Sequence, residues 1–395
     1  EHHGYVMEDN IGAGKFGEVW RARLAGSRSG EEYILKRLFV EKGRAVHLSG
    51  LREIHFGIAL EGVPHICRFV ESFEEVDGAH THLWLVFFNE GLSLRKFLYE
   101  ASVAGSGASS TIRYTPSRMW HATRSSPQGE ATVRELVRQL LEGVADCHSR
   151  NVTHRDIKPE NLIVHLPSPE EMGAKKGEAG PILKLADFGS AIDHYSISHL
   201  YPPEGPTTND ETLDYAPPEV LFGSGQPHSA LRPRSYDLWS VGVVFLELVL
   251  GTSKVFQVDL RTRAILDRRL HASTEAVRHQ AYLLRSMMDA CIYPPPPTLP
   301  AKHPSALMSP RCSDSAIQAT LQSRDELGAG LPSLWAVKLV RRLLAWNPEA
   351  RIPADRALLH AYFRPEGGGW PCTKEGVTIE FEFEDEASAA CGLKG

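Results

Sequence analysis

The octapeptide from residue 154 to residue 161, His-Arg-Asp-Ile-Lys-Pro-Glu-Asn, constrains this chain more than any other stretch. It places a carboxylate (Asp156), an ammonium group (Lys158) and an amide (Asn161) close together in sequence. Phosphoryl transfer requires a base that orients a hydroxyl, a cation for developing phosphate charge and an oxygen ligand for magnesium. A polar surface turn is the alternative for this stretch taken alone, so the rest of the chain has to decide.

The segments on either side of this octapeptide predict a loop held on a rigid support. Apolar residues recur every three or four positions over 131–150, which predicts an amphipathic helix. Residues 162–164 and 182–185 read as strands, and the second ends in Asp187-Phe188-Gly189. An aspartate at a strand end, followed by a glycine hinge, can hold a metal ion and let the downstream segment move.

Residues 11–19 form a glycine-rich stretch, Ile-Gly-Ala-Gly-Lys-Phe-Gly-Glu-Val. Glycines let backbone N–H groups approach phosphate oxygens without an intervening Cβ. A dinucleotide-binding fold would continue into a helix. Here the residues after Gly17 alternate between apolar and polar, which favours a hairpin with a second strand.

Lys36 lies inside an apolar, strand-like run over residues 31–40. A lysine in such a strand needs an anionic partner, either a nucleotide phosphate or a glutamate on the next helix. Residues 49–60 predict a helix with Leu51, Ile54 and Ile58 on its apolar stripe, from which Glu53 can face Lys36. Two solvated charges are the alternative.

Composition excludes several classes of protein. A net charge of −6 and a pI near 6.3 give no reason to expect nucleic acid as a partner. The longest apolar run, 241–250, predicts a buried helix and is too short to span a membrane. The six cysteines lack metal-binding spacing, so zinc is not expected, and reduced thiols in the cytoplasm or nucleus are the simpler account.

Three stretches predict insertions, near residues 101–130, 167–180 and 252–335. The first is rich in Ser, Gly, Ala, Thr and Pro, and we expect a flexible insertion there. The third contains a tetraproline at 294–297, either a docking ligand or a stiff loop. Residues 364–395 read as a linker and an acidic tail, in which 377–386 alternates apolar and acidic residues as an edge strand or a disordered segment would.

Taken together, these motifs resemble those of the eukaryotic protein kinases over residues 5–363. They stand in that family's order: the glycine-rich loop, Lys36, Glu53, the octapeptide, Asp187-Phe188-Gly189, Tyr215-Ala-Pro-Pro-Glu219, the helix that starts near Asp237, and Arg351. The resemblance implies an α+β, two-lobed kinase fold. Residues 5–88 would form a small antiparallel-sheet lobe with one helix, and residues 89–363 a larger, mainly helical lobe.

The resemblance also implies roles for the residues of the octapeptide and its surroundings. Asp156 would orient the substrate hydroxyl, and Lys158, two residues on as in serine/threonine kinases, would neutralise the transferring γ-phosphoryl group. Asn161 and Asp187 would be the ligands of Mg2+. The nucleotide, ATP, would be held by the side chains and glycines at Ile11, Gly12, Gly14, Gly17, Val19, Lys36, Glu53 and Ile163.

The activation segment would run from Asp187 to Glu219. Thr212 would bond the catalytic Asp and Lys, and Arg155 would receive a phosphate carried by Thr207 or Thr208, both of which could equally be ordinary loop threonines. Glu219 would pair with Arg351 from the last helical region.

Two positions near the nucleotide are notable for size. The residue that is alanine in the family is Ile34 here, which would narrow the nucleotide slot and lower ATP affinity. Phe87 stands where the family has its gatekeeper, with the adenine-reading backbone expected near residues 88–90.

Two functions follow as expectations. The first is a serine/threonine protein kinase acting on a protein substrate; the second is a pseudokinase scaffold, favoured by Ile34 and the long insertions. A small-molecule phosphotransferase is a third, weaker option, disfavoured by Thr212 and the Pro-Pro-Glu element. The wording of several motifs is most similar to a plant and green-algal kinase group, some members of which are fused to a PP2C-type phosphatase, so a fused or associated phosphatase domain is a further expectation.

Overall fold

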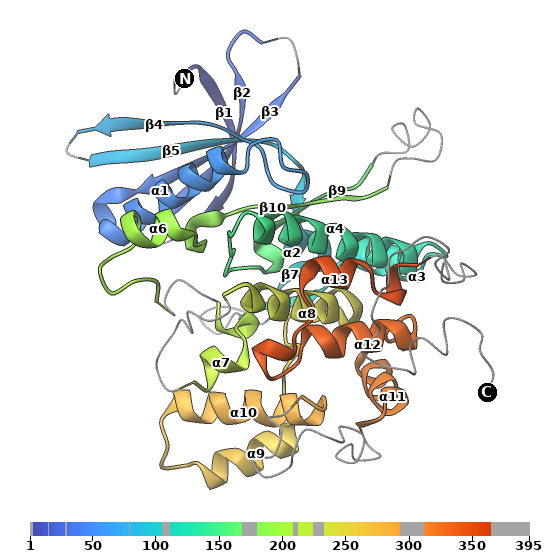
Figure 1. Ribbon diagram of the computed structural model, residues 1–395. Helices are drawn as coiled ribbons and strands as arrows, with labels where there is room; N and C mark the ends of the chain where they lie inside the picture. The colour runs from blue at the N-terminus through green and yellow to red at the C-terminus, as the bar shows by residue number, and fades with distance from the viewer. Residues whose placement is uncertain are drawn as a thin grey trace, which may run out of the picture.

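The protein consists of a small lobe built on an antiparallel sheet and a larger, mainly helical lobe (Figure 1). The computed structural model describes residues 3–14, 16–27, 30–78, 80–104, 111–167, 180–207, 212–223, 233–292 and 312–364. This arrangement confirms the predicted α+β, two-lobed fold.

The small lobe holds five strands in the order β1-β2-β3-β5-β4. Their bounds are Tyr5–Ala13 (β1), Gly17–Leu24 (β2), Glu32–Phe39 (β3), Phe69–Asp77 (β4) and His80–Phe88 (β5). All neighbours pair antiparallel. The predicted hairpin around the glycine-rich loop is therefore confirmed.

Helix α1 (Arg44–Ala59) packs beside this sheet, by a face that only partly matches the stripe that the sequence predicted. It buries Val46, Leu48 and Phe56, whereas Ile58 is 61% exposed. Of the predicted stripe, Ile54 does pack against the apolar cluster beneath the sheet and Leu51 is half-buried, so the prediction was wrong at Ile58. The inner face instead includes two polar residues, Arg52 and Glu53, which bind partners elsewhere in the molecule.

The large lobe is organised around α8 (Arg234–Leu250), whose residues are buried from Ser235 onwards. Against it lie α4 (Gly129–Ser149), the predicted support of the octapeptide, and α12 (Leu334–Leu343) (Figure 1). A three-stranded sheet follows the order β10-β9-β6. The remaining elements are β6 (Leu92–Ser93), α2 (Leu94–Leu98), β9 (Leu162–His165), β10 (Ile182–Leu185), α6 (His194–His199), α7 (Pro218–Leu221), α9 (Leu260–Arg269), α10 (Glu275–Asp289), α11 (Asp314–Arg324) and α13 (Ala354–Leu358).

The prediction of a flexible insertion over 101–130 was wrong. Strands β7 (Tyr99–Ala104) and β8 (Thr111–Pro116) pair as a hairpin, and α3 (Arg118–Ser125) follows. Helix α3 is fixed by Trp120, which is 1% exposed and donates from Nε1 to the carbonyl of Leu248 at 2.8 Å. The burial and hydrogen bond of Trp120 thus stabilise a helix in a segment whose composition predicted no regular structure.

The cysteine prediction also needs correction, since Cys291 and Cys312 form a disulfide between the end of α10 and the start of α11. The predicted insertion at 167–180, the tetraproline and the acidic tail lie wholly or largely outside the described residues. Within the described ranges, no helix has the length and apolar character needed to cross a membrane.

Candidate active site

The octapeptide loop is fixed from below by one buried carboxylate. Asp237, which is fully buried near the start of α8, accepts hydrogen bonds from the backbone N–H of His154 (2.9 Å) and of Arg155 (2.8 Å). Its Oδ2 also lies 2.9 Å from Nε2 of His148 on α4. These contacts hold Arg155 in a left-handed backbone conformation (φ 67°), which non-glycine residues adopt rarely.

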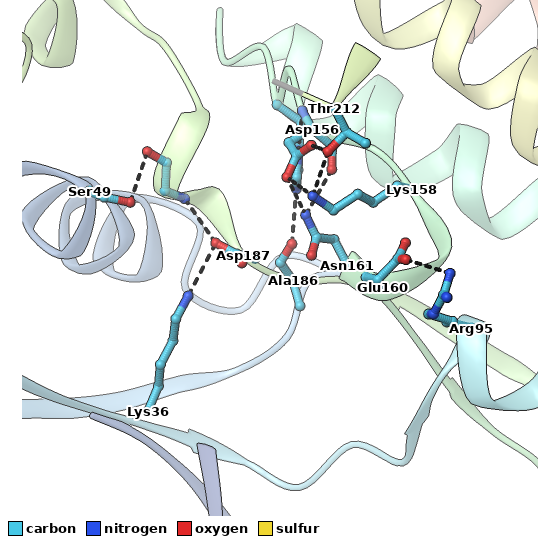
Figure 2. A network of polar contacts seen from close by, with 12 residues as sticks. Lys36, Ser49, Arg95, Asp156, Lys158, Glu160, Asn161, Ala186, Asp187 and Thr212 are labelled. Carbon is cyan, nitrogen blue, oxygen red and sulfur yellow. Dashed lines mark hydrogen bonds and ion pairs between the residues drawn. The ribbon is translucent and has the colours of Figure 1, made fainter. Parts of the chain in front are cut away.

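The side chains of the loop converge on Asp156 (Figure 2). Lys158 Nζ lies 2.6 Å from Asp156 Oδ2, and Asn161 Nδ2 donates to the same oxygen at 2.9 Å. The Thr212 hydroxyl donates to Asp156 Oδ1 at 2.9 Å and accepts from Lys158 Nζ at 2.8 Å. The predicted bonds of Thr212 to Asp156 and Lys158 are confirmed.

Asp187 lies next to this network because the two chain segments are bonded together. The Ala186 N–H donates to the carbonyl of Asn161 at 2.9 Å. Asp187 has a left-handed backbone (φ 61°), and its Oδ1 lies 3.3 Å from Lys36 Nζ. The same Nζ is 2.7 Å from Glu53 Oε1, which confirms that α1 presents Glu53 to Lys36.

The electrostatics of this group favour ionised Asp187 beside a charged lysine. Burial works to raise the pKa of Asp187, but Lys36 and then Lys158 outweigh it, so the pKa lies below its usual range. Burial works to lower the pKa of Lys36, and the carboxylates of Asp187 and Glu53 reverse this and raise it. For Glu53, burial dominates over the attraction of Lys36 and raises the pKa to about 7.

The three glycines of the β1–β2 loop meet different surroundings. A Cβ on Gly17 would lie 2.2 Å from the carbonyl oxygen of Arg37, so only glycine fits there. A Cβ on Gly14 would meet nothing within 4 Å, and one on Gly12 only Val19 at 3.9 Å. Packing therefore explains Gly17, whereas Gly12 and Gly14 leave the backbone open to an approaching phosphate.

The other residues expected at the nucleotide lie on the adjoining strands. Ile11 and Val19 are on β1 and β2, and Ile163 is on β9, where it is half-buried. Half-buried Ile34 on β3 stands opposite Phe87 of β5 in the sheet register.

The segment that follows Asp187 is tied to the large lobe at its far end. Arg351 donates to Glu219 through two parallel hydrogen bonds of 2.6 and 2.5 Å, which confirms the predicted pair. At the middle of the segment, Arg155 donates to the backbone carbonyl of Thr207 at 3.3 Å. Thr208 lies outside the described residues.

Two groups at this site were not assigned a role from the sequence. From the sequence, Asp237 indicated only the start of a helix, and its place against the octapeptide loop is visible only in the tertiary structure. The one sequence feature that could have suggested its role is a carboxylate at the start of an apolar helix, because a buried carboxylate needs hydrogen-bond donors. Arg52 and Tyr201 gave no signal at all. The structure shows Arg52 buried on α1, with its guanidinium 3.9 Å from the Tyr201 ring.

Comparison with known proteins agrees with this geometry. A protein kinase domain profile matches residues 5–363. A probable inactive protein kinase from Arabidopsis thaliana is 38% identical, over 82% of this chain and 99% of its own length. Cyclin-dependent kinase B2-1 from the same plant is 28% identical, over 90% of this chain and 92% of its own.

Among solved structures, the CAK complex of Chaetomium thermophilum bound to ATP-γ-S contains a chain of the same fold. The similarity has a TM-score of 0.59 at 22% identity, and covers 92% of each chain. Together with the profile match over nearly all of the described residues, these likenesses show that the chain belongs to the protein kinase family.

Proposed function

We propose that this protein is a serine/threonine protein kinase that transfers the γ-phosphoryl group of Mg-ATP to a protein hydroxyl. The observation that carries the proposal is the closed set of contacts around Asp156, together with the Lys36–Glu53 ion pair. Every charged group that the reaction needs is present and within bonding distance of its neighbours. Positioning and charge neutralisation are most of what phosphoryl transfer requires of a protein.

In this proposal Asp156 orients the substrate hydroxyl and accepts its proton. Its Oδ2 is held by Lys158 and Asn161, which fix the direction of the carboxylate. The ammonium group of Lys158, also held by Thr212, is placed to neutralise charge on the phosphoryl group as it moves. Thr212 thereby joins the loop to the segment on which a protein substrate would lie.

The triphosphate would lie between the glycine-rich loop and Lys36. Gly12 and Gly14 allow the backbone to approach its oxygens, and Lys36 would hold the α- and β-phosphates while Glu53 fixes its direction. Val19 and Ile163 would enclose the adenine ring.

Asn161 and Asp187 would hold magnesium, since both offer the hard oxygen ligands that this ion prefers. The amide nitrogen of Asn161 is used twice by Asp156, which leaves Oδ1 as the side chain's acceptor, and Asp187 is held in its ionised form. When bound, magnesium neutralises phosphate charge and orients the oxygens.

A pseudokinase scaffold is the second candidate. Ile34, in register with Phe87, places two large side chains beside the expected adenine site, and the plant relative is described as probably inactive. A thermal shift with Mg-ATP separates the two candidates. Nucleotide at a hundred times its dissociation constant stabilises a binding protein by about 2.7 kcal/mol, and an unchanged melting temperature would contradict the kinase assignment.

The finer setting of the protein is also a proposal. We propose a cytoplasmic or nuclear location, although reduced thiols no longer support it because Cys291 and Cys312 form a disulfide. We infer no nucleic-acid partner from the acidic net charge, and membership of the plant and green-algal kinase group from motif wording. A fused or associated PP2C-type phosphatase rests on that resemblance alone.

A further inference from the structure

We infer that Tyr201 is a positioning residue, which couples the helix that carries Glu53 to the loop that carries Asp156. Resting on the proposed function, the inference names a residue through which both halves of that site are held together. Its contacts are with Arg52 and Arg155, each of which immediately precedes one of the two carboxylates in the sequence.

The first half of the coupling is made by Arg52. This side chain is charged, yet it is only 3% exposed and lies on the inner face of α1. Its Nε donates to the carbonyl of Gly189 at 2.5 Å, and its NH1 donates to the carbonyl of Leu200 at 2.8 Å. The guanidinium carbon lies 3.9 Å from the centroid of the Tyr201 ring, a cation–π contact in a buried setting.

The second half is made by Arg155, which is 2% exposed. Its NH1 donates to the Tyr201 hydroxyl at 3.3 Å and to the carbonyl of Ser190 at 3.2 Å. The hydroxyl in turn lies 2.8 Å from the Ser190 carbonyl and 3.2 Å from that of Ala191, to which it can donate. The ring of Tyr201 thus serves one arginine, and its hydroxyl the other.

The position of Tyr201 in the fold is itself fixed. Helix α6 precedes it, and its N-terminus is capped by a reciprocal pair of hydrogen bonds between Asp193 and Ser196. Asp193 also lies 2.8 Å from His55 of α1, and two prolines follow at 202 and 203. Since Tyr201 is 6% exposed and held on both sides, a shift of α1 would be transmitted to Arg155.

Two substitutions separate the ring from the hydroxyl. Tyr201→Phe keeps the ring against Arg52 and removes the contact with Arg155, whereas Tyr201→Leu removes both. For Tyr201→Phe we expect kcat to fall about tenfold with an unchanged KM for ATP, because only the loop that carries Asp156 is loosened. For Tyr201→Leu we expect a further fall in kcat and a rise of about tenfold in the KM for ATP, because α1 is released as well. Ile197→Ala, on α6 just before Tyr201 and 46% exposed in the parent, is the matched control and should match the parent in both constants.

Hydrogen exchange tests the coupling without any need for activity. In Tyr201→Leu, amides of α1 and of residues 154–161 should exchange about tenfold faster than in the parent, while those in the middle of α8 are unchanged. Parent-like exchange in both segments would overturn the inference, as would parent-like kcat and KM in both variants. Should the parent itself transfer no phosphate, the proposed kinase function fails, and the exchange rates alone decide on Tyr201.

Discussion

Replacement of Glu219 by alanine should destabilise the protein, because it strips a buried cation of its only carboxylate partner among the described residues. The Arg351 side chain is fully buried, and Glu219 is 28% exposed. Arg351 also donates to the carbonyls of Ala345, Ser235 and Trp346, at 2.9, 2.9 and 3.2 Å. These neutral acceptors would remain, but the charge would lose its counter-charge.

The magnitude follows from the burial of the two partners. Removing one member of a buried ion pair typically costs about 3–5 kcal/mol, because the other charge is left uncompensated. Water can reach the partly exposed Glu219 side, so we expect the low end, about 3 kcal/mol. Over the matched domain, residues 5–363, an unfolding entropy of about 2.1 cal/mol/K per residue converts this into a melting temperature lowered by about 4 °C.

Thermal unfolding followed by circular dichroism is the assay, with Asp146→Ala as the matched control. Asp146 forms an ion pair with Arg150 in which both side chains are more than one-third exposed, so its loss should cost less than about 1 kcal/mol. The double variant Glu219→Leu/Arg351→Met, which removes both charges, should melt above Glu219→Ala. A melting temperature for Glu219→Ala within 1 °C of the parent (roughly the scale of the control) would show that the buried Arg351 does not depend on its counter-charge.

Three further outcomes are expected. Burial raises the pKa of Glu247 to about 7 in the folded protein, so the stability that this group contributes is present below pH 4.5 and lost as pH rises through 7. Relative to Glu247→Gln, the free energy of unfolding of the parent should fall by up to about 3 kcal/mol between pH 5 and pH 8 in denaturant titrations. A constant difference between the two proteins over this range would contradict this. Gly189→Ala should weaken Mg-ATP binding about tenfold by calorimetry, since the new Cβ would lie 2.4 Å from Ser49 Oγ and push α1 outward. Adding Ser49→Ala to the same chain should recover most of the lost affinity, and no recovery would show that the clash lies elsewhere. Ile34→Ala should raise ATP affinity several-fold in the same titration, about 1 kcal/mol, and unchanged affinity would mean that Ile34 does not narrow the nucleotide site.

The sequence predicted those parts of the site in which a residue type is unusual for its local segment, so that it needs a particular partner. Lys36 stands in an apolar strand, and it could be expected to find a carboxylate; Glu53 was the nearest candidate and is the partner observed. Such positions carry their own evidence, because local chemistry demands a particular answer.

The rest depends on contacts between distant segments, which no local pattern encodes. The inner face of α1 was misjudged because an apolar stripe assumes an apolar core. Instead, Arg52 binds Gly189, 137 positions away in sequence, and Glu53 binds Lys36, 17 positions away. The β7–β8 hairpin and α3 escaped prediction because one tryptophan, bonded across 128 positions of sequence, fixes them. The contact of Asp237 with the octapeptide loop is likewise made between segments distant in sequence.

The most direct test of the account is transfer of radiolabelled phosphate from Mg-ATP to a generic basic protein, with the parent measured beside Asp156→Asn. Asn keeps the size of the side chain but removes the carboxylate that Lys158, Asn161 and Thr212 hold in place. We expect labelled serine or threonine with the parent and loss of essentially all transfer with the variant, at a similar melting temperature. Equal transfer by the two proteins, or none by a nucleotide-bound parent, would contradict it.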